Sequence, residues 1–257
     1  GNARKPYNCG KCHTTGWTDA VDDFATDPMQ YQDGRPGIHG TWSEPGVHCE
    51  ACHGAGAAHA ASPSADNIEL ILTDAADELV SARCGECHTR HASNRAQVSG
   101  GFIRHHEQYD EMISGPHKNL NCVSCHDPHA STRFTPEEGV TISCTTCHPS
   151  TTVVDGHAAP EVDLACIDCH MPGATKSGVK FNDYKGDVKT HIFSINASGA
   201  SAEEALFETY DNETPDDTSD DITAVALDVG VTLDFVCLGC HDGTTASAKT
   251  LAEAAAT

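Results

Sequence analysis

All cysteines of this chain occur in one repeated unit, a pair spaced i, i+3 that is followed directly by a histidine. The sequence contains 14 cysteines, so the unit occurs seven times and no cysteine lies outside it. The cysteine pairs are Cys9 and Cys12, Cys49 and Cys52, Cys84 and Cys87, Cys122 and Cys125, Cys144 and Cys147, Cys166 and Cys169, and Cys237 and Cys240. The histidines that follow them are His13, His53, His88, His126, His148, His170 and His241.

The C-x-x-C-H unit is the attachment signature of c-type haem. Its two thiols add across the two vinyl groups of the porphyrin as thioethers, and the histidine on the same turn binds the iron from one face. Other interpretations fit less well, because zinc ribbons do not require a histidine after each pair and a thioredoxin-like site uses one pair beside a βαβ pattern. A disulfide framework does not favour this spacing throughout. The sequence therefore predicts seven haem c groups.

Ten of the 17 histidines lie outside these units and are candidates for the second, distal axial position on each iron. Seven are needed if every haem is bis-histidine. We expect distal ligation by His59, His106, His117, His129, His157 and His191. The seventh ligand is expected from His39, with His48, His91 and His105 as alternatives, unless another subunit supplies it or it is absent. The chain has only three methionines, so haems of low potential are expected.

The position of His129 allows a geometric argument about its haem. It follows His126 by three residues, and three extended residues span at most about 10 Å. The chain therefore cannot pass around the porphyrin edge to the far face of the same haem, so His129 should bind a different one. Pro128 stiffens this short step. The same argument applies to His59, and such ligands would tie neighbouring haems into close stacks.

The composition leaves little material for an ordinary apolar core. Aromatic residues make up 5% of the 257 residues, while the chain has 22 glycines and 12 prolines. Haems would fill the centre instead, with the polypeptide wrapped around them. We therefore expect mostly irregular coil with a few short α-helices and minimal β structure, in a multihaem fold with a haem-stack core. The chain should form one heptahaem unit over residues 1–257, with a four-haem part at 1–130 and a three-haem part at 131–257.

A few segments carry the pattern of regular structure. Residues 102–114 predict a helix that contains His105 and His106 and ends at Gly115 and Pro116. His157 is expected in a loop and His191 in a short β-like run.

Further elements are expected near the C-terminus. The segment from Ser201 to Glu204 is a capping box before a short helix. Residues 229–236 favour a strand, and the alanine-rich residues 246–256 favour a terminal helix. The acidic run at 211–221 is expected to be a solvated loop rather than a calcium site.

The charge balance excludes several classes of partner. Lysine and arginine number 15 against 38 acidic residues, a formal net charge of −23. Binding to DNA or RNA needs the opposite sign, and so does docking on an anionic membrane surface. No apolar stretch is long enough to span a bilayer. Gly1 fits a mature N-terminus after removal of a signal peptide, so we expect a secreted, extracellular protein.

Several local sequences resemble those of known multihaem cytochromes. The segment from Gly46 to His59 resembles one that is common in cytochromes related to the hydroxylamine-pathway tetrahaem cytochromes. The segment from His106 through His117 to His129 resembles the extracellular nanowire cytochromes of metal-reducing microbes. Cys166-Ile-Asp-Cys-His-Met-Pro, with His191 downstream, is similar to an arrangement in large multihaem cytochromes.

The resemblance implies a continuous chain of bis-histidine haems, in alternating stacked and perpendicular pairs. In nanowire cytochromes the subunits polymerise so that terminal haems meet, and one distal histidine can come from the adjacent subunit. The motifs at Cys9 and Cys237 would suit such a head-to-tail contact between copies of this chain.

The expected function is extracellular electron transfer by an iron-containing filament, without a catalytic site. Upstream partners would be membrane or periplasmic cytochromes, and the downstream partner an extracellular electron acceptor. Two alternatives remain open. One is a soluble electron shuttle, and the other is a multihaem reductase with one open haem, which would lack a distal ligand.

Overall fold

A computed structural model describes residues 9–18, 40–69, 77–89, 95–149, 157, 164–211, 218 and 221–256. For residues 77–80 only the backbone is described. The expectations for His39 and His91 fall outside these ranges, as does most of the acidic run at 211–221. Backbone contacts divide the chain into two units, Gly1–Cys87 and His88–Thr257. The division predicted near residue 130 is a statement about haem groups and stays a prediction.

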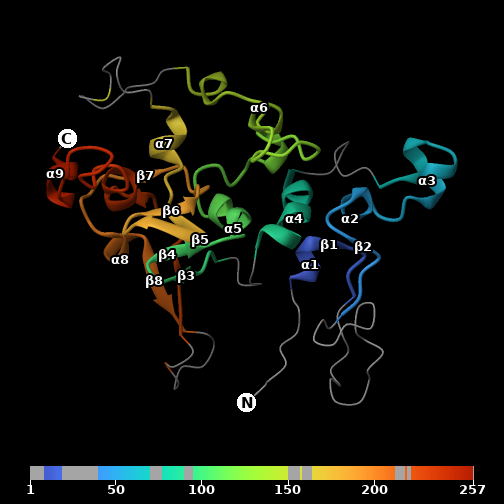
Figure 1. The fold of residues 1–257 in the computed structure, drawn as a ribbon, viewed down its shortest axis with the longest axis horizontal. Coiled ribbons are helices and arrows are strands. Elements are labelled where there is room, and N and C mark those ends of the chain that lie inside the picture. Colours follow the sequence, from blue (N-terminus) through green and yellow to red (C-terminus); the bar gives the residue numbers. More distant parts are fainter. Residues whose placement is uncertain are drawn as a thin grey trace. The chain divides into compact units, whose positions relative to one another are not determined.

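The first unit consists of short helices around a two-stranded ribbon (Figure 1). Its strands, β1 (Thr14–Thr15) and β2 (Glu44–Pro45), pair antiparallel. Its helices are α1 (Gly10–His13), α2 (Cys49–His53), α3 (Ala57–Ala61), a 3-10 helix (Ala65–Asn67) and α4 (Asp77–His88), whose last residue begins the second unit.

Two tryptophans stack in the described part of this unit. The rings of Trp17 and Trp42 stack with their centroids 6.0 Å apart. A Cβ atom on Gly10 would lie 2.1 Å from the Trp17 ring, so only glycine fits there. The Thr15 hydroxyl donates to the Gly46 carbonyl at 2.9 Å and accepts from the backbone N–H of His48 at 2.9 Å. The ribbon thereby ties the first C-x-x-C-H motif to the second.

The second unit is built on a four-stranded sheet in the order β3-β4-β5-β6. These strands are β3 (Val98–Ser99), β4 (Phe102–Arg104), β5 (Thr175–Asn182) and β6 (Lys185–Val188). Strands β4 and β5 are parallel, with Ile103 opposite Thr175, and the other neighbours are antiparallel. Two smaller ribbons join β8 (Phe207–Tyr210) with β9 (Ile222–Val225) and β7 (Ile195–Asn196) with β10 (Val231–Thr232).

Short helices complete the second unit. The α-helices are α5 (Gln108–Ile113), α6 (Pro136–Gly139), α7 (Cys166–His170), α8 (Ala202–Ala205) and α9 (Leu251–Ala255). Single turns of 3-10 helix cover Cys122–Ser124 and Cys144–Thr146, and a π-helical turn covers Asp234–Leu238. An apolar core lies among β4, α8, β9 and the π-helical turn, with Phe102, Ile103, Ile192, Leu206, Val225, Val231 and Phe235 buried.

The predicted fold class is confirmed in its coarse form, since the described chain is mostly coil with short helices and small sheets. The helix predicted over residues 102–114 is wrong in its first half. Phe102 and Ile103 are buried in strand β4, because pairing with β5 outweighs local helical preference. His105 and His106 lie in the turn before α5, and the predicted stop at Gly115 is confirmed, since α5 ends at Ile113.

The other local predictions are confirmed in part. The capping box is present, because the Glu204 carboxylate accepts from the Ser201 backbone N–H at 2.9 Å. The strand expected over 229–236 covers only Val231–Thr232 and then becomes the π-helical turn. The terminal helix is shorter than predicted. His191 lies in a bend and not in a strand, so that expectation is wrong; His157 lies in a bend, outside any helix or strand.

Candidate haem-binding sites

Each C-x-x-C-H motif is wound into one helical turn. The backbone N–H of the motif histidine donates to the carbonyl of the first cysteine, for example from His126 to Cys122 at 3.0 Å and from His241 to Cys237 at 2.8 Å. Such a turn places two thiols and an imidazole within reach of one flat ligand. None of the 14 cysteines is joined in a disulfide in this structure.

The motif histidines are oriented through Nδ1. Four of them have Nδ1 close to a backbone carbonyl: His53 to Glu69 at 2.7 Å, His126 to Gly139 at 3.1 Å, His170 to Phe193 at 2.8 Å and His241 to Ser247 at 2.9 Å. A fifth, His88, has Nδ1 3.2 Å from Gln108 Oε1. A carbonyl only accepts, so Nδ1 carries the proton and Nε2 keeps its lone pair for a metal.

Four motif histidines are each faced by a second imidazole. The ring centroids are separated by 6.5 Å for His88 and His106, 6.3 Å for His126 and His191, 6.1 Å for His148 and His117, and 5.8 Å for His241 and His157. In every pair one member belongs to a C-x-x-C-H motif and the other was predicted as a distal ligand. The structure thus brings four of the predicted ligands to four different motifs.

These separations fit an iron shared between two imidazoles. A metal–nitrogen bond is about 2.0–2.1 Å long and the ring centre lies about 1 Å beyond the nitrogen, so two axial imidazoles hold their centroids about 6 Å apart. Imidazoles in van der Waals contact would pack closer than this, as His105 and His106 do at 4.5 Å. The residues present therefore fit a bis-histidine haem at these four motifs.

Two of the predicted distal imidazoles are held in the neutral form that binds a metal. Burial, with the nearby His126 as the second cause, lowers the pKa of His191 to about 4. Burial also lowers the pKa of His117, with His148 as the second cause. A third distal candidate, His106, has φ +66°, a conformation that non-glycine residues rarely adopt and that is typical of strained functional positions.

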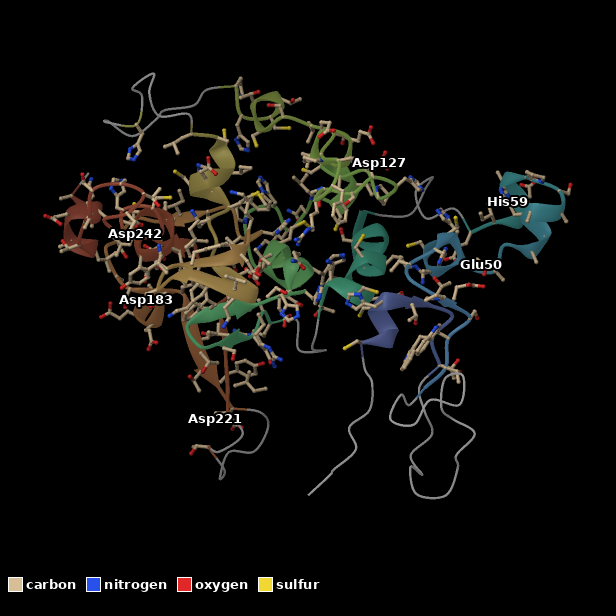
Figure 2. All side chains as sticks on the ribbon, in the orientation of Figure 1. Glu50, His59, Asp127, Asp183, Asp221 and Asp242 are labelled. Carbon is tan, nitrogen blue, oxygen red and sulfur yellow. The ribbon has the colours of Figure 1, made fainter. Side chains whose placement is uncertain are left out.

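For other candidate distal ligands within the described residues, the structure gives hydrogen-bond partners of the imidazole. His59, on α3 (Figure 2), has Nδ1 3.1 Å from both the Ser64 carbonyl and Asn67 Oδ1, which leaves Nε2 available. His129 has Nδ1 3.2 Å from Asp127 Oδ1. His48 differs, because its Nε2 is 2.9 Å from the Pro45 carbonyl and is therefore engaged. His39 and His91 lie outside the described residues.

Thiols of different motifs approach one another within each unit. In the first unit, burial and the neighbouring Cys12 raise the pKa of Cys87 to about 12. In the second unit, burial raises the pKa of Cys125, and Cys144 and Cys147 raise it further. Burial and the thiol of Cys240 act in the same way on the pKa of Cys169. The motifs at Cys122 and Cys144 are therefore neighbours, as are those at Cys166 and Cys237.

Sequence reasoning missed the residues that support the ligands. Glu111 is fully buried on α5 and accepts from the Thr175 hydroxyl at 2.6 Å, from the Thr190 hydroxyl at 3.1 Å and from the backbone N–H of His191. Burial raises the pKa of Glu111 to about 7. Phe193 contributes a carbonyl to His170. Neither residue belongs to a motif, and no sequence signal marks them.

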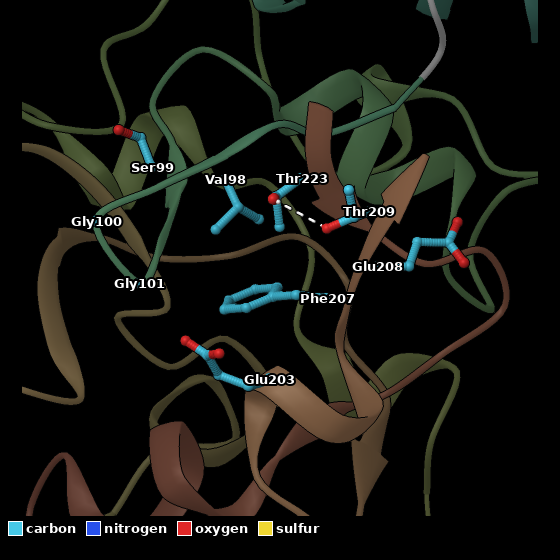
Figure 3. A pocket seen from close by; sticks show the side chains of 9 residues that line it. All are labelled: Val98, Ser99, Gly100, Gly101, Glu203, Phe207, Glu208, Thr209 and Thr223. Atoms are coloured by element: carbon cyan, nitrogen blue, oxygen red, sulfur yellow. Dashed lines mark hydrogen bonds between the residues drawn. The ribbon is translucent and has the colours of Figure 1, made fainter. Parts of the chain in front are cut away.

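A surface hollow of about 340 Å³ lies apart from these histidines (Figure 3). The turn between β3 and β4 and strand β8 line it, and the Phe207 ring is among the lining side chains. It holds the carboxylates of Glu203 and Glu208, and Glu208 pairs with Arg95. No thiol or imidazole is among its described lining residues.

Comparison with known proteins agrees with these motifs. A family model described as the doubled CXXCH motif matches residues 115–153, which contain the motifs at Cys122 and Cys144 together with His117. A search of curated protein sequences finds no match. The structure is similar to that of the octahaem sulfite reductase MccA of Wolinella succinogenes, with a TM-score of 0.50 and 17% identity over 82% of this chain.

The chain is a multihaem c-type cytochrome. Haem c attaches at its paired C-x-x-C-H motifs. The cytochrome spans 38% of the length of the sulfite reductase chain, and the likeness to that enzyme concerns the fold. The outer cell wall cytochrome OcwA also aligns with it, at a TM-score of 0.39 and 18% identity over 72% of this chain and 55% of that one.

One finding concerns the membrane. No helix within the described ranges of the cytochrome is long and apolar enough to cross a bilayer.

Proposed function

We propose that this cytochrome carries electrons along seven covalently attached haems, one at each C-x-x-C-H motif. The observation that carries the proposal is the set of four imidazole pairs at a metal-sharing separation, each with one partner from a motif. When bound, each haem supplies an iron that takes up and releases one electron. The protein provides attachment, axial ligands and spacing.

The geometry supports an assignment of ligands for four sites. His106 would complete the site of His88, His191 that of His126, His117 that of His148, and His157 that of His241. For the remaining proximal ligands, His13, His53 and His170, the candidates are His59, His129 and His39. His48 is the weakest alternative, because its Nε2 already contacts a carbonyl.

The protein groups also set the conditions for electron transfer. Carbonyl acceptors at Nδ1 fix the plane and tautomer of four motif histidines, His53, His126, His170 and His241. Histidine ligation on both faces, together with the net charge of −23, favours low potentials. The neighbouring motifs at Cys122 and Cys144, and at Cys166 and Cys237, provide short steps between sites.

Intact-mass measurement of the native protein tests the haem count, and optical spectroscopy tests the ligation. We expect seven haem additions and a low-spin spectrum for the oxidised and the reduced protein. His191→Ala should convert one haem to the high-spin form, and Asn121→Ala, beside a motif but without an imidazole, serves as the matched control. Fewer than seven additions, or no change in His191→Ala, would contradict the proposal.

We extend this proposal to the surroundings of the protein. The cytochrome would act outside the cell, receive electrons from membrane or periplasmic cytochromes and pass them to an extracellular acceptor. Copies would join head to tail in a filament. The resemblance to nanowire cytochromes supports this version. Electron microscopy of native secreted material tests it: uniform filaments with this chain as the repeat would support the wire, and discrete particles at all salt and protein concentrations would favour a soluble shuttle.

A second candidate function is reduction of a small oxyanion at one open haem. The fold neighbour with the higher TM-score is named as a sulfite reductase, which is why we consider this candidate. Carbon monoxide binding to the reduced protein separates the two. Binding of one carbon monoxide per seven haems would favour the reductase. For an electron carrier we expect almost no binding, because six-coordinate irons have no vacant position.

A further inference from the structure

Phe193 lies where three of the proposed haem sites meet. The centroid of its ring is 4.5 Å from that of His117, at an interplanar angle of 74°, and 5.8 Å from that of His191, at 84°. Its carbonyl lies 2.8 Å from Nδ1 of His170. His117 faces the motif of Cys144, His191 faces that of Cys122, and His170 belongs to that of Cys166. One residue therefore touches an axial ligand of each of three sites.

The backbone at Phe193 is held in an unfavourable conformation. Its φ is +64°, in the left-handed region that a bulky aromatic residue rarely adopts. The backbone N–H of Ser194 donates to the Ile192 carbonyl at 2.8 Å, which closes a three-residue turn around Phe193. Turns of this kind with positive φ are rare and strained. Strain that persists in a folded protein is typical of functional sites, where the surrounding structure enforces it.

The surroundings fix this turn on both sides. Ile192 is fully buried in the apolar core. Ser194 donates its hydroxyl to the Val229 carbonyl at 3.0 Å and accepts at its own carbonyl from Val231 N–H at 2.8 Å. A Cβ on Gly115 would lie 2.5 Å from the Ile192 carbonyl oxygen, so glycine allows the His117 segment to approach the turn closely.

We propose that Phe193 is a positioning residue shared by the three sites: its ring sets the imidazole planes of His117 and His191, and its carbonyl sets that of His170. The inference rests on the proposed function, since it assumes that these histidines bind iron. The imidazoles of His117 and His191 each make one edge-to-face contact with the Phe193 ring, and this contact restricts their rotation, because aromatic rings favour the edge-to-face arrangement over a face-to-face one. A carbonyl bound to Nδ1 restricts His170 in the same way.

The relative orientation of the two axial imidazoles determines the electron paramagnetic resonance signal of a low-spin ferric haem. A residue that sets this orientation therefore has a spectroscopic signature that a merely structural residue lacks. The signals are first assigned in the whole protein with His117→Met and His191→Met, each of which should remove one of them.

The test compares three variants of Phe193. Phe193→Asn removes the ring but tolerates positive φ, so it should keep the haem content and shift the signals of the His117 and His191 sites while the His170 site is unchanged. Phe193→Tyr keeps the ring, so both signals should stay as they are in the parent protein. Phe193→Val, whose branched Cβ opposes positive φ, should also alter the His170 site. Phe181→Asn, on the exposed part of β5, is the matched control.

Each outcome decides the inference. Full haem content with unshifted signals in Phe193→Asn would overturn it, and so would a uniform change at all sites, which would indicate a structural role. If Phe193→Asn does not accumulate, Phe193→Leu, which keeps an apolar side chain and loses the aromatic edge, gives the same test. If His117→Met and His191→Met remove no signal from the native spectrum, the proposed function fails, and not this inference alone.

Discussion

The two units of this cytochrome use different material to hold the same motif. In the second unit, the described residues include a four-stranded sheet and a cluster of buried aliphatic and aromatic side chains. In the first unit, the buried residues within the described ranges are small or polar, such as Gly10, Thr14 and Thr15, beside one stacked tryptophan pair. If the first unit binds haem as we propose, its folding should depend on haem more than that of the second unit, whose described residues include an apolar core.

The largest expected difference between the two units is in their stability after removal of the haems. In protein produced without haem attachment, we expect backbone amides of the first unit to lose protection from hydrogen exchange over residues 9–18 and 40–69. Residues 102–104 and 222–232 should keep measurable protection, because their apolar contacts do not involve a motif. Exchange followed by mass spectrometry of the full chain, with the haem-loaded protein as control, makes the comparison. Retained protection throughout residues 9–18 and 40–69 of the haem-free protein would contradict the comparison.

A core substitution tests the opposite side of the comparison. Phe235 is 3% exposed, and its ring packs edge-to-face on Phe102 at 5.7 Å and on Phe207 at 6.3 Å. Phe235→Ala should lower the free energy of unfolding of the second unit by about 3–5 kcal/mol. Phe181→Ala is the control, because Phe181 is 66% exposed and should change stability by less than about 1 kcal/mol. Denaturant unfolding, followed by far-ultraviolet circular dichroism, measures the stability of both variants. Equal losses would show that the apolar cluster is not the stabilising core.

The sequence predicted the chemistry of the molecule better than its architecture. Seven repeated motifs predict the thioether and proximal positions without any tertiary information. Because seven haems need distal ligands, the sequence also predicted that histidines such as His106, His117, His157 and His191 would serve as these ligands. The local signals at Ser201 and Gly115 also predicted helix boundaries correctly.

What the sequence did not predict depends on contacts between distant segments. The local sequence predicts helix where the structure has strand β4, because the parallel partner of this strand, β5, lies some 70 residues further along the chain. The pairing of His117 with His148 needs a tertiary fold to bring the rings together. The carbonyl acceptors of Gly139, Phe193 and Ser247 are backbone atoms, and backbone atoms carry no residue-specific signal. Ligand identity is thus a property of composition, and ligand pairing a property of the fold.

The buried carboxylate of Glu111 links the core of the second unit to His191, one of the proposed distal ligands. It accepts hydrogen bonds from Thr175, Thr190 and the backbone of His191. Glu111→Leu should destabilise this unit by about 1–3 kcal/mol, because donors that are buried in the folded state lose their acceptor. Glu111→Gln, which retains a carbonyl acceptor, should lose less. Thermal unfolding of haem-loaded protein measures both variants, and a Glu111→Leu variant as stable as the parent would show that the core does not depend on this anchor.

The smallest expected effect compares two ligands within the second unit. His191 is held against the core, with 21% of its side chain exposed, while His129 is 72% exposed and follows its own motif by three residues. His191→Ala should make the haem on Cys122 and Cys125 high-spin. His129→Ala should make a different haem high-spin and leave that one unchanged, because three residues cannot carry the chain to its far face. Resonance Raman spectra of the two variants, read against each other, give the answer. A change at the same haem in both variants would mean that the short segment does pass around the porphyrin edge, so that the exposed His129 also affects the haem of its own motif.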